Sequence, residues 1–348
     1  MKSLKLFLNK KWVLDFLKKR VNYYFPNFKL VDCKIDLFSI FLDYHRIVVK
    51  YYLRLQDKNG QLIRKTIVGK VQERMRGSEQ KSSIQTDYVI TKFLSTHNFA
   101  DIVPRPLDFI PNYNLYLYEF IPGHSLQELS IKYKSEKFFE KIEPIISIIK
   151  KIHRFKSTSS KVFKIEKDWE EEERQNNLQL MEKYYNFGFS KLLFLIKNCQ
   201  GIKKRHSKYF GQKFYRLIHG DFYSRNIIIS QNKIKLCDFS DSKIYEPLND
   251  IGNFLINTEL MFEYYFHGEY RFLMEKLKNL FEQYYFNRPI DKAEKIKINF
   301  FVLTNLIRII VSVAMSEGGR GLTKKKNELV EKLLKIGEEK SNILNIDL

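Results

Sequence analysis

The pattern of apolar and polar positions divides the chain into a strand-rich first part and a helical second part. Between about residues 32 and 120, β-rich runs such as "HRIVVKYYLRL" and "QLIRKTIVGKV" are separated by short polar segments. The segment "DKNG" at 57–60 joins these two runs, and its composition is typical of a hairpin turn. A run with helical spacing, "SSIQTDYVITKFLSTH", follows, and "PRPLDFI" and "YNLYLYEF" predict two more strands.

From about residue 126 the pattern is mostly helical, and only residues 216–239 interrupt it with short strands. The apolar run "FFVLTNLIRIIVSVAM" is interrupted by Asn305 and Arg308, whereas a membrane span needs roughly 18 to 20 consecutive apolar residues. We therefore expect a buried helix there and no transmembrane segment. The layout predicts an α+β fold with two lobes, a small antiparallel-sheet lobe at 1–120 and a larger, mainly helical lobe at 121–348.

The N-terminal stretch "MKSLKLFLNKKWVLDFLKKR" has no uninterrupted apolar segment and no small-residue cleavage site, so we predict no secretion signal. Its apolar residues fall within about half of a helical circumference. They are Leu4, Phe7, Leu8, Leu14 and Leu17. This face could rest on an anionic membrane surface or pack against the rest of the domain. Packing is favoured, and peripheral membrane contact stays open.

Composition and charge narrow the function classes. A chain of 348 residues with 44% apolar content can bury a sizeable core. Cys33, Cys199 and Cys237 are far apart and indicate neither a disulfide framework nor a zinc site, so we expect a cytoplasmic protein. The net charge of +21 would suit nucleic acid, but the basic residues are spread along the whole chain. This spread favours compositional bias over nucleic-acid binding.

The clearest candidate chemistry lies in "LIHGDFYSRNIIISQNKIKLCDF" at 217–239. Asp221 and Asn226 lie on a loop between two β-like runs, and a hairpin would fold Asp238 back toward Asn226. Asn226 and Asp238 would then place two oxygen-bearing side chains at the open ends of paired strands, where they could bind Mg²⁺. Asp221 would remain available for an acceptor hydroxyl. The alternative is a hairpin whose polar turns carry no chemistry.

The same spacing matches the catalytic loop and metal-binding Asp of kinase-like phosphotransferases. "HGDxxxxN" followed by a strand-borne "DF" resembles the aminoglycoside phosphotransferase and choline kinase family, with Gly220 where the protein-kinase loop has Arg. The resemblance implies a protein-kinase-like bilobal fold and transfer of the γ-phosphoryl group of ATP, with Mg²⁺, to a hydroxyl of a small molecule. It further implies that Asp221 is catalytic and that Asn226 and Asp238 bind the metal.

Two more motifs extend the resemblance toward the nucleotide. "TIVGKV" places Lys70 where these kinases hold the α- and β-phosphates. Asp87, on the helix that follows, would position Lys70, although the family usually has Glu there. "LYEFIPGHSL" resembles the family hinge, which implies that backbone groups at Glu119, Phe120 and Ile121 bind adenine.

A fourth motif bears on the acceptor. "DFSDSKIYEPLNDIGNFL" resembles a family segment in which an acid, here Asp250, supports the catalytic loop. The run from Asp238 to Asp250 is too short for the activation segment and A-P-E motif of protein kinases, so we expect a small-molecule acceptor. Aminoglycosides, choline, sugars of the cell envelope and amino-acid derivatives all stay open, and the sequence indicates no oligomeric state.

One departure from the family keeps other functions open. The loop region "DLFSIFLDYHR" contains no glycine, although kinase-like folds often use glycines there so that backbone amides approach the phosphates. A catalytically weak pseudokinase, a nucleotide-binding module and a protein-directed kinase are therefore alternatives to the small-molecule kinase.

Overall fold

The computed structural model describes residues 4–41, 46–72, 83–155, 188–231, 233–315 and 324–346. By packing, the chain forms two units. One contains Met1–Gly123 and Ile228–Asp241, and the other contains His124–Ile227 and Ser242–Leu348. The sequence predicts a boundary at residue 120 between two lobes. The separate functions of these two lobes stay a prediction. By packing, residues 121–123 and residues 228–241, which include Asp238, belong with the first unit.

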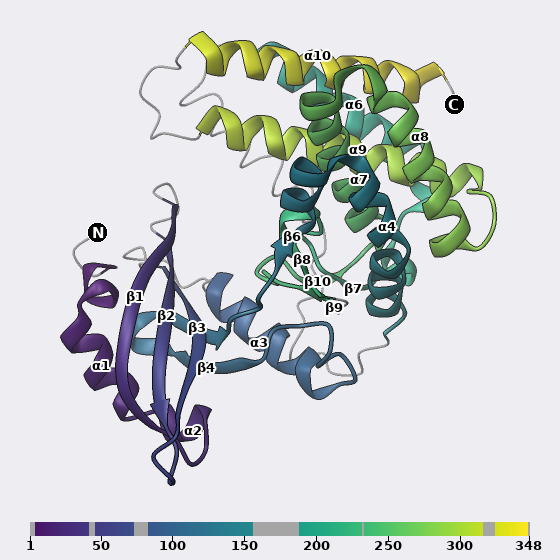
Figure 1. The fold of residues 1–348 in the computed structure, drawn as a ribbon. Coiled ribbons are helices and arrows are strands. Elements are labelled where there is room, and N and C mark those ends of the chain that lie inside the picture. The colour runs from purple at the N-terminus through teal and green to yellow at the C-terminus, as the bar shows by residue number, and fades with distance from the viewer. Residues whose placement is uncertain are drawn as a thin grey trace. The chain divides into compact units, whose positions relative to one another are not determined.

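The first unit is built on a five-stranded antiparallel sheet with the order β1-β2-β3-β5-β4 (Figure 1). Its strands are β1 (Lys29–Phe41), β2 (Arg46–Gln56), β3 (Leu62–Gln72), β4 (Pro106–Ile110) and β5 (Leu115–Glu119). Asp57 closes the turn between β2 and β3, because its Oδ1 accepts hydrogen bonds from the backbone N–H groups of Asn59 and Gln61. The predicted hairpin and the predicted helix after it, α3 (Ser83–Thr96), are both confirmed.

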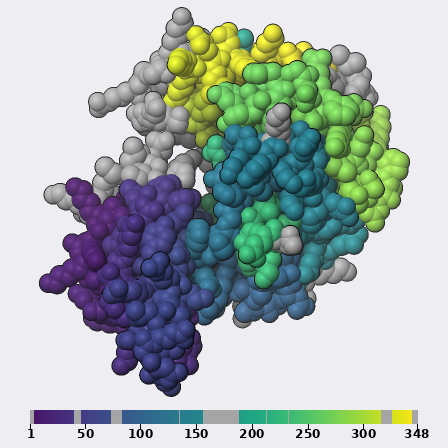
Figure 2. All heavy atoms as spheres, viewed as in Figure 1, coloured from purple at the N-terminus to yellow at the C-terminus, as the bar shows by residue number. Residues whose placement is uncertain are grey.

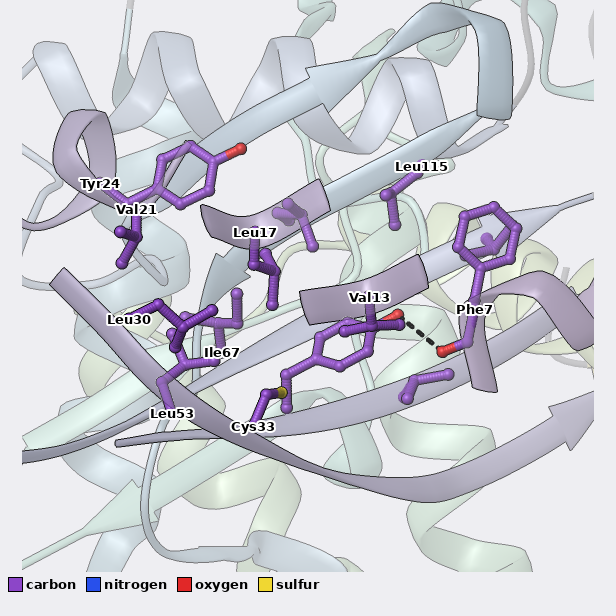
Figure 3. Packing of buried hydrophobic residues seen from close by; sticks show 14 of the residues in the cluster. Phe7, Val13, Leu17, Val21, Tyr24, Leu30, Cys33, Leu53, Ile67 and Leu115 are labelled. Carbon is purple, nitrogen blue, oxygen red and sulfur yellow. Dashed lines mark hydrogen bonds between the residues drawn. The ribbon is translucent and has the colours of Figure 1, made fainter. Parts of the chain in front are cut away.

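An N-terminal segment packs on one face of this sheet. It consists of η1 (Leu4–Leu8), α1 (Lys10–Lys18) and α2 (Val21–Tyr24). Figure 3 shows side chains of this segment, including Phe7 and Leu17, packed with strand residues such as Leu53. In Figure 2 the same segment lies against the strands as a purple layer. Leu4, Phe7 and Leu17 are buried in this cluster, as expected if the apolar N-terminal face packs on the domain.

Residues 228–241 join the first unit through β9 (Lys233–Leu236), which follows β8 (Ile227–Ser230) in the chain. The backbone N–H of Leu236 donates to the carbonyl oxygen of Ile102 at 2.7 Å. Lys235 Nζ donates to the carbonyl oxygens of Ala100 and Val103 at 3.1 and 2.6 Å. These bonds link β9 to the segment between α3 and β4, which explains why Asp238 packs with the sheet that carries Lys70.

The second unit is mainly helical (Figure 1). Its larger helices are α4 (Leu126–Arg154), α6 (Phe189–Arg205), α7 (Leu248–Phe266), α8 (Tyr270–Leu280), α9 (Lys292–Met315) and α10 (Lys324–Ile346). Its strands and short helical turns are β6 (His124–Ser125), η3 (Ser207–Tyr209), η4 (Gln212–Phe214), β7 (Arg216–Ile218), η5 (Ser224–Asn226), β10 (Lys243–Tyr245), η6 (His267–Glu269) and the π-helical η7 (Phe281–Phe286).

Helices α7 and α9 approach each other closely at Gly252. A Cβ atom at this position would lie 2.6 Å from the Cβ of Phe301 and 2.8 Å from its backbone carbon, so only glycine fits. Within α9, the stretch Lys292–Ala314 is long and apolar enough to cross a membrane by length and composition. Because 67% of its most apolar window is buried inside the structure, it has the burial expected of a core helix.

Candidate active site

Lys70 lies in the centre of the sheet of the first unit. It pairs with Val48 of β2 and with Tyr116 of β5 in the strand register. Its ammonium nitrogen lies 2.6 Å from Asp87 Oδ2 and 3.1 Å from Asp238 Oδ1. Burial lowers the pKa of Lys70, but the charges of Asp238 and Asp87 outweigh burial and raise this pKa well above its usual value. Lys70 is therefore a permanently charged group held by two carboxylates.

Asp87 makes the contact that the family motif predicts, even though its side chain is one methylene shorter than Glu. Its Oδ2 accepts from Lys70, whereas its Oδ1 accepts from the backbone N–H of Phe239 at 2.9 Å and from the Thr91 hydroxyl at 3.3 Å. The side chain is only 3% exposed, so these three bonds compensate for the burial of its charge. Asp87 thus ties β3, α3 and the residue after Asp238 together.

Asp238 is held in an ionised and conformationally unusual state. Its backbone has a φ of +68°, a left-handed conformation that costs a non-glycine residue energy and often marks a functional site. Burial raises the pKa of its carboxyl group, but the positive charges of Lys70 and then Arg46 lower it to about 2. The carboxylate is therefore charged at any pH at which the protein works, as a metal ligand requires.

This depressed pKa gives a prediction about stability and pH. Since the folded-state pKa of Asp238 lies below its usual 3.8, the ionised group stabilises the fold above about pH 4, and this contribution is lost as the pH falls toward 2. The unfolding free energy of wild type relative to Asp238→Asn should therefore shrink below about pH 4 in denaturant titrations. A difference that stays constant from pH 6 to pH 3 would contradict this.

The hinge segment offers a smaller set of backbone groups than the sequence suggests. The N–H of Glu119 donates to the Arg105 carbonyl at 2.9 Å, and the N–H of Phe120 donates to the Thr66 carbonyl at 3.1 Å. Both donors are thus used inside the first unit. An adenine edge would therefore have to be recognised by backbone groups of Glu119, Phe120 and Ile121 other than these two N–H groups.

In the second unit, Asp250 anchors the loop that contains Asp221. Its carboxylate accepts the backbone N–H of His219 at 2.7 Å and the backbone N–H of Gly220 at 2.9 Å. Gly220 has a φ of +85°, a conformation that side-chain-bearing residues avoid, so glycine lets both N–H groups converge on one carboxylate. The positive φ of Gly220 therefore explains why this chain has glycine where the protein-kinase loop has Arg.

Two residues to which the sequence assigns no role support Asp250. His153, at the end of α4, lies with its Nε2 3.0 Å from Asp250 Oδ2 and its Nδ1 2.7 Å from the Tyr285 hydroxyl. Burial raises the pKa of Tyr285, so its hydroxyl keeps its proton beside Nδ1. Because a carboxylate can only accept a hydrogen bond, Nε2 of His153 carries the proton that it donates to Asp250.

The interactions around Asp250 predict a large loss of stability on its removal. Asp250→Ala would leave two buried backbone N–H groups and His153 without their acceptor, which should cost about 3 to 5 kcal/mol of unfolding free energy. Denaturant unfolding measures this loss. Glu275→Ala, at an exposed position on α8, is the control and should change stability by less than about 0.5 kcal/mol. Equal effects of both substitutions would refute the anchoring role.

Asp221 and Asn226 are joined directly. Asn226 Nδ2 donates to the Asp221 carboxylate at 3.0 Å and to the Asp221 carbonyl at 2.9 Å. The backbone N–H of Asp221 donates to His219 Nδ1 at 3.3 Å, and the Ser242 hydroxyl donates to the His219 carbonyl at 2.7 Å. Because Nδ2 faces Asp221, the amide oxygen of Asn226 points to the opposite side. This orientation presents an oxygen, the atom that a hard cation needs.

The predicted site residues therefore form two groups, one in each unit. Lys70, Asp87 and Asp238 are in contact in the first unit, which also contains the hinge segment. Asp221 and Asn226 are in contact in the second. Within the residues that the structure describes, no cluster of three or more His, Cys, Asp or Glu side chains could hold a metal ion. Mg²⁺ does not need one, because it is usually held by one or two carboxylates together with substrate phosphates.

Comparison with known families places these motifs in one context. A family model described as "phosphotransferase enzyme family" (APH) matches residues 65–280, a span that includes every predicted site residue. The chain belongs to the phosphotransferase enzyme family. Membership agrees with the kinase activity that the resemblance in its motifs implies.

Solved structures show the same fold in other members of this kinase class. An amicoumacin kinase in complex with AMP-PNP, Ca²⁺ and its ligand aligns with 97% of this chain and 96% of its own, at a TM-score of 0.64 and 18% identity. A choline kinase from Cryptosporidium parvum aligns over 97% of both chains, at a TM-score of 0.63 and 13% identity. An ADP-bound aminoglycoside phosphotransferase, APH(2'')-Ib, covers 94% of this chain at a TM-score of 0.57 and 16% identity.

A shorter match leads to a protein kinase. A protein of Acanthamoeba polyphaga mimivirus, L268, named as a candidate serine/threonine-protein kinase, is 37% identical over 67 residues. This match covers 19% of the present chain and only 11% of the viral protein. It agrees with the kinase-like fold but says nothing about most of either chain.

Proposed function

We propose that this protein transfers the γ-phosphoryl group of ATP, with Mg²⁺, to a hydroxyl group of a small molecule. The observation that carries the proposal is the contact of Lys70 with Asp87 and Asp238. Three residues far apart in the sequence, each chosen by a family motif, are in contact in the structure. Such an arrangement holds a positive charge in place for phosphate groups without reorganisation during the reaction.

In this proposal the residues of the first unit bind the nucleotide. Lys70 contacts the α- and β-phosphates, and Asp87 positions its ammonium group. The Glu119 carbonyl and the Ile121 amide meet the adenine edge, while Phe120 anchors the segment through its bond to Thr66. The Phe120 ring also lies 4.6 Å from Lys50 Nζ, a cation–π distance that fixes the ring beside the sheet.

The metal would be held by oxygen atoms of Asp238 and Asn226. Asp238 fits this role because its pKa of about 2 keeps it ionised, and Asn226 fits because its amide nitrogen is turned toward Asp221. Bound Mg²⁺ would neutralise charge on the phosphates. Both residues are ones that the motif of this family assigns to the metal.

Asp221 would act on the acceptor. Its carboxylate orients the acceptor hydroxyl and takes up its proton as the hydroxyl oxygen forms a bond to the γ-phosphorus. The bond from the γ-phosphorus to the oxygen that bridges it to the β-phosphate breaks, and ADP leaves. Asn226 holds the Asp221 carboxylate by a hydrogen bond of 3.0 Å, so the base is fixed before the acceptor binds.

The acceptor we propose is an aminoglycoside, choline or sugar-like alcohol. The structural relatives include kinases of amicoumacin, choline and aminoglycosides. They support this class of acceptor and do not select one compound within it. A cytoplasmic location fits Cys33, Cys199 and Cys237, none of which is in a disulfide.

A protein-directed kinase is the second candidate, and the match to the mimivirus protein is the observation that favours it. The short chain from Asp238 to Asp250 argues against it, since it contains β10 and leaves no room for a long activation segment. Phosphorylation of a general protein substrate such as casein, with no transfer to any small alcohol, would favour this candidate.

The proposal is tested with purified protein, Mg²⁺-ATP and a panel of one aminoglycoside, choline and several sugars. ADP formation that depends on one acceptor, with a mass-spectrometric gain of one phosphate in that compound, is the expected result. Nucleotide binding by calorimetry without transfer to any alcohol or protein would instead support a pseudokinase or nucleotide-binding module.

A further inference from the structure

Arg225 lies in the loop of Asp221, within the short helical turn η5 that also contains Asn226. It immediately precedes Asn226, whose Nδ2 donates to the Asp221 carboxylate at 3.0 Å. Consecutive Cα atoms are about 3.8 Å apart, so Arg225 begins next to the residue that holds the proposed base. The proposed function gives this arginine no role.

A neutral partner holds the exposed side chain of Arg225. Its Nε donates to Gln127 Oε1, in the first turn of α4, at 2.8 Å. Among the residues that the structure describes, no carboxylate forms an ion pair with Arg225. Glu128, the next residue of α4, uses its carboxylate to accept the backbone N–H of Ser125 at 2.7 Å. The guanidinium is therefore an oriented, planar cation, a group well suited to a carboxylate or a phosphate.

Two acids in the second half of α7 do not offset the charge of Arg225. Helix α7 meets the loop of Asp221 where the Ser224 hydroxyl donates to Met261 Sδ at 3.9 Å. The two acids lie two positions before and after Met261, about 200° around the helix from it, so they face away from Ser224. Each is paired with a lysine of α10, at 2.8 and 3.0 Å respectively. The pairs are Glu259–Lys340 and Glu263–Lys332.

The charges around Asp221 favour an acceptor that carries a negative group. A cationic acceptor such as choline or an aminoglycoside would meet the guanidinium of Arg225, and like charges disfavour binding. An anionic acceptor would meet the carboxylate of Asp221, but Arg225 compensates for that repulsion. The net charge of +21 of the whole chain also attracts anions over longer distances.

We infer that the acceptor is an alcohol that also carries a carboxylate or phosphate group, and that the guanidinium of Arg225 binds this group. The acceptor hydroxyl lies at Asp221 and receives the phosphoryl group as described above. This inference rests on the proposed function, because it assumes that Asp221 acts on the acceptor. Among the proposed acceptors it selects sugar-like alcohols with an acid group over choline and aminoglycosides.

A metabolite extract separated by ion exchange into cationic, neutral and anionic fractions tests this inference. Each fraction is incubated with the protein, Mg²⁺ and ATP that carries heavy oxygen on its γ-phosphoryl group, and mass spectrometry identifies the labelled products. We expect most of the labelled product from the anionic fraction. Treating this fraction first with a phosphatase, which is then removed, separates the two chemistries, because it destroys a phosphorylated acceptor and leaves a carboxylate intact.

Variants of Arg225 test its contact with the acceptor identified in this way. Arg225→Gln should raise the KM of that acceptor at least about tenfold, the loss expected for a hydrogen bond to a charged group, with a smaller effect on kcat. The affinity for Mg²⁺-ATP, measured by calorimetry, should stay within about twofold. Arg225→Glu should raise KM further because it repels the anion, whereas Arg225→Lys should retain part of the affinity.

Two control variants separate anion binding from general charge and from structure. Arg271 is an exposed arginine of α8 whose Nε also donates to a neutral partner, the Tyr270 hydroxyl, at 3.3 Å. Arg271→Gln removes the same charge outside the loop of Asp221 and should leave KM within about twofold. Gln127→Ala removes the partner of Arg225 but keeps its charge, so it should raise KM less than Arg225→Gln does.

The outcomes are distinct. Labelled product from the cationic or neutral fraction alone, or an unchanged KM in Arg225→Gln, overturns the inference and leaves the proposed function intact. A rise in KM in Gln127→Ala as large as in Arg225→Gln overturns it in favour of a structural role. An equal loss of ATP affinity in Arg225→Gln overturns it in favour of a nucleotide contact. Labelled product from no fraction overturns both the inference and the proposed function.

Discussion

Asp221→Asn is expected to lower kcat by about 10²- to 10⁴-fold while leaving the affinity for Mg²⁺-ATP within about twofold of wild type. The amide oxygen can still accept the hydrogen bond from Asn226, so the geometry of the loop is retained. The amide cannot take up a proton, however, so the acceptor hydroxyl loses its base. Steady-state kinetics with a phosphorylated acceptor and calorimetry with ATP measure the two effects separately.

Asp291→Asn is the matched control for this substitution. Asp291 is exposed in the same unit, where its carboxylate accepts the backbone N–H of Glu294 at the start of α9. Asparagine serves equally well in that position, so kcat should not change. A variant at Asp221 that retains more than about half of the wild-type kcat would show that Asp221 is not the base.

The second large effect is expected for Lys70→Met. Removing the ammonium leaves the carboxylates of Asp87 and Asp238 close together in a buried site with no compensating charge. We expect the unfolding free energy to fall by about 3 to 5 kcal/mol, and ATP affinity to fall with it, because both the ion contacts and the phosphate contact are lost. Denaturant unfolding and calorimetry give the two values.

Lys65→Met is the matched control for Lys70, since it lies on the same strand with 43% of its side chain exposed and only a 3.7 Å approach to Glu119. Its loss should cost less than about 1 kcal/mol. In the double variant Lys70→Met/Asp238→Asn the loss should be smaller than the sum of the two single losses, because one unpaired charge has been removed. Additive losses would mean that Lys70 and Asp238 are not coupled.

Local features of the fold could be predicted from the sequence because their causes are local. The turn after β2 follows from Asp57 and its bonds to residues two and four positions later. Helix α3 follows from the spacing of its apolar residues, and the buried α9 from its long apolar run. In each case the residues that fix the structure lie within one element.

Part of the site could be predicted because its motifs identify residues by position. Lys70 and Asp87 were selected in this way, and their ammonium and carboxylate are in contact at 2.6 Å. No propensity scale would have found that pair, since a lysine on a strand and an aspartate on a helix are usually solvated. The roles of these residues in catalysis and binding stay predictions.

Other features of the site depend on contacts between distant residues and could not be predicted. His153 and Tyr285 support Asp250, yet His153 lies 97 residues before Asp250, and Tyr285 lies 132 residues after His153. The packing of residues 228–241 with the first unit depends on bonds from β9 to residues near Ile102. Nothing in the local pattern of apolar residues specifies such contacts.

Phosphoryl transfer to an unknown small alcohol can be measured most directly in a metabolite extract. The protein is incubated with the extract, Mg²⁺ and ATP that carries heavy oxygen on its γ-phosphoryl group, and products are analysed by mass spectrometry. We expect at least one hydroxyl compound to gain a labelled phosphate with wild type and not with Asp221→Asn. Bound ATP with no labelled product in either sample, or equal product in both, would contradict the assignment of Asp221 to phosphoryl transfer.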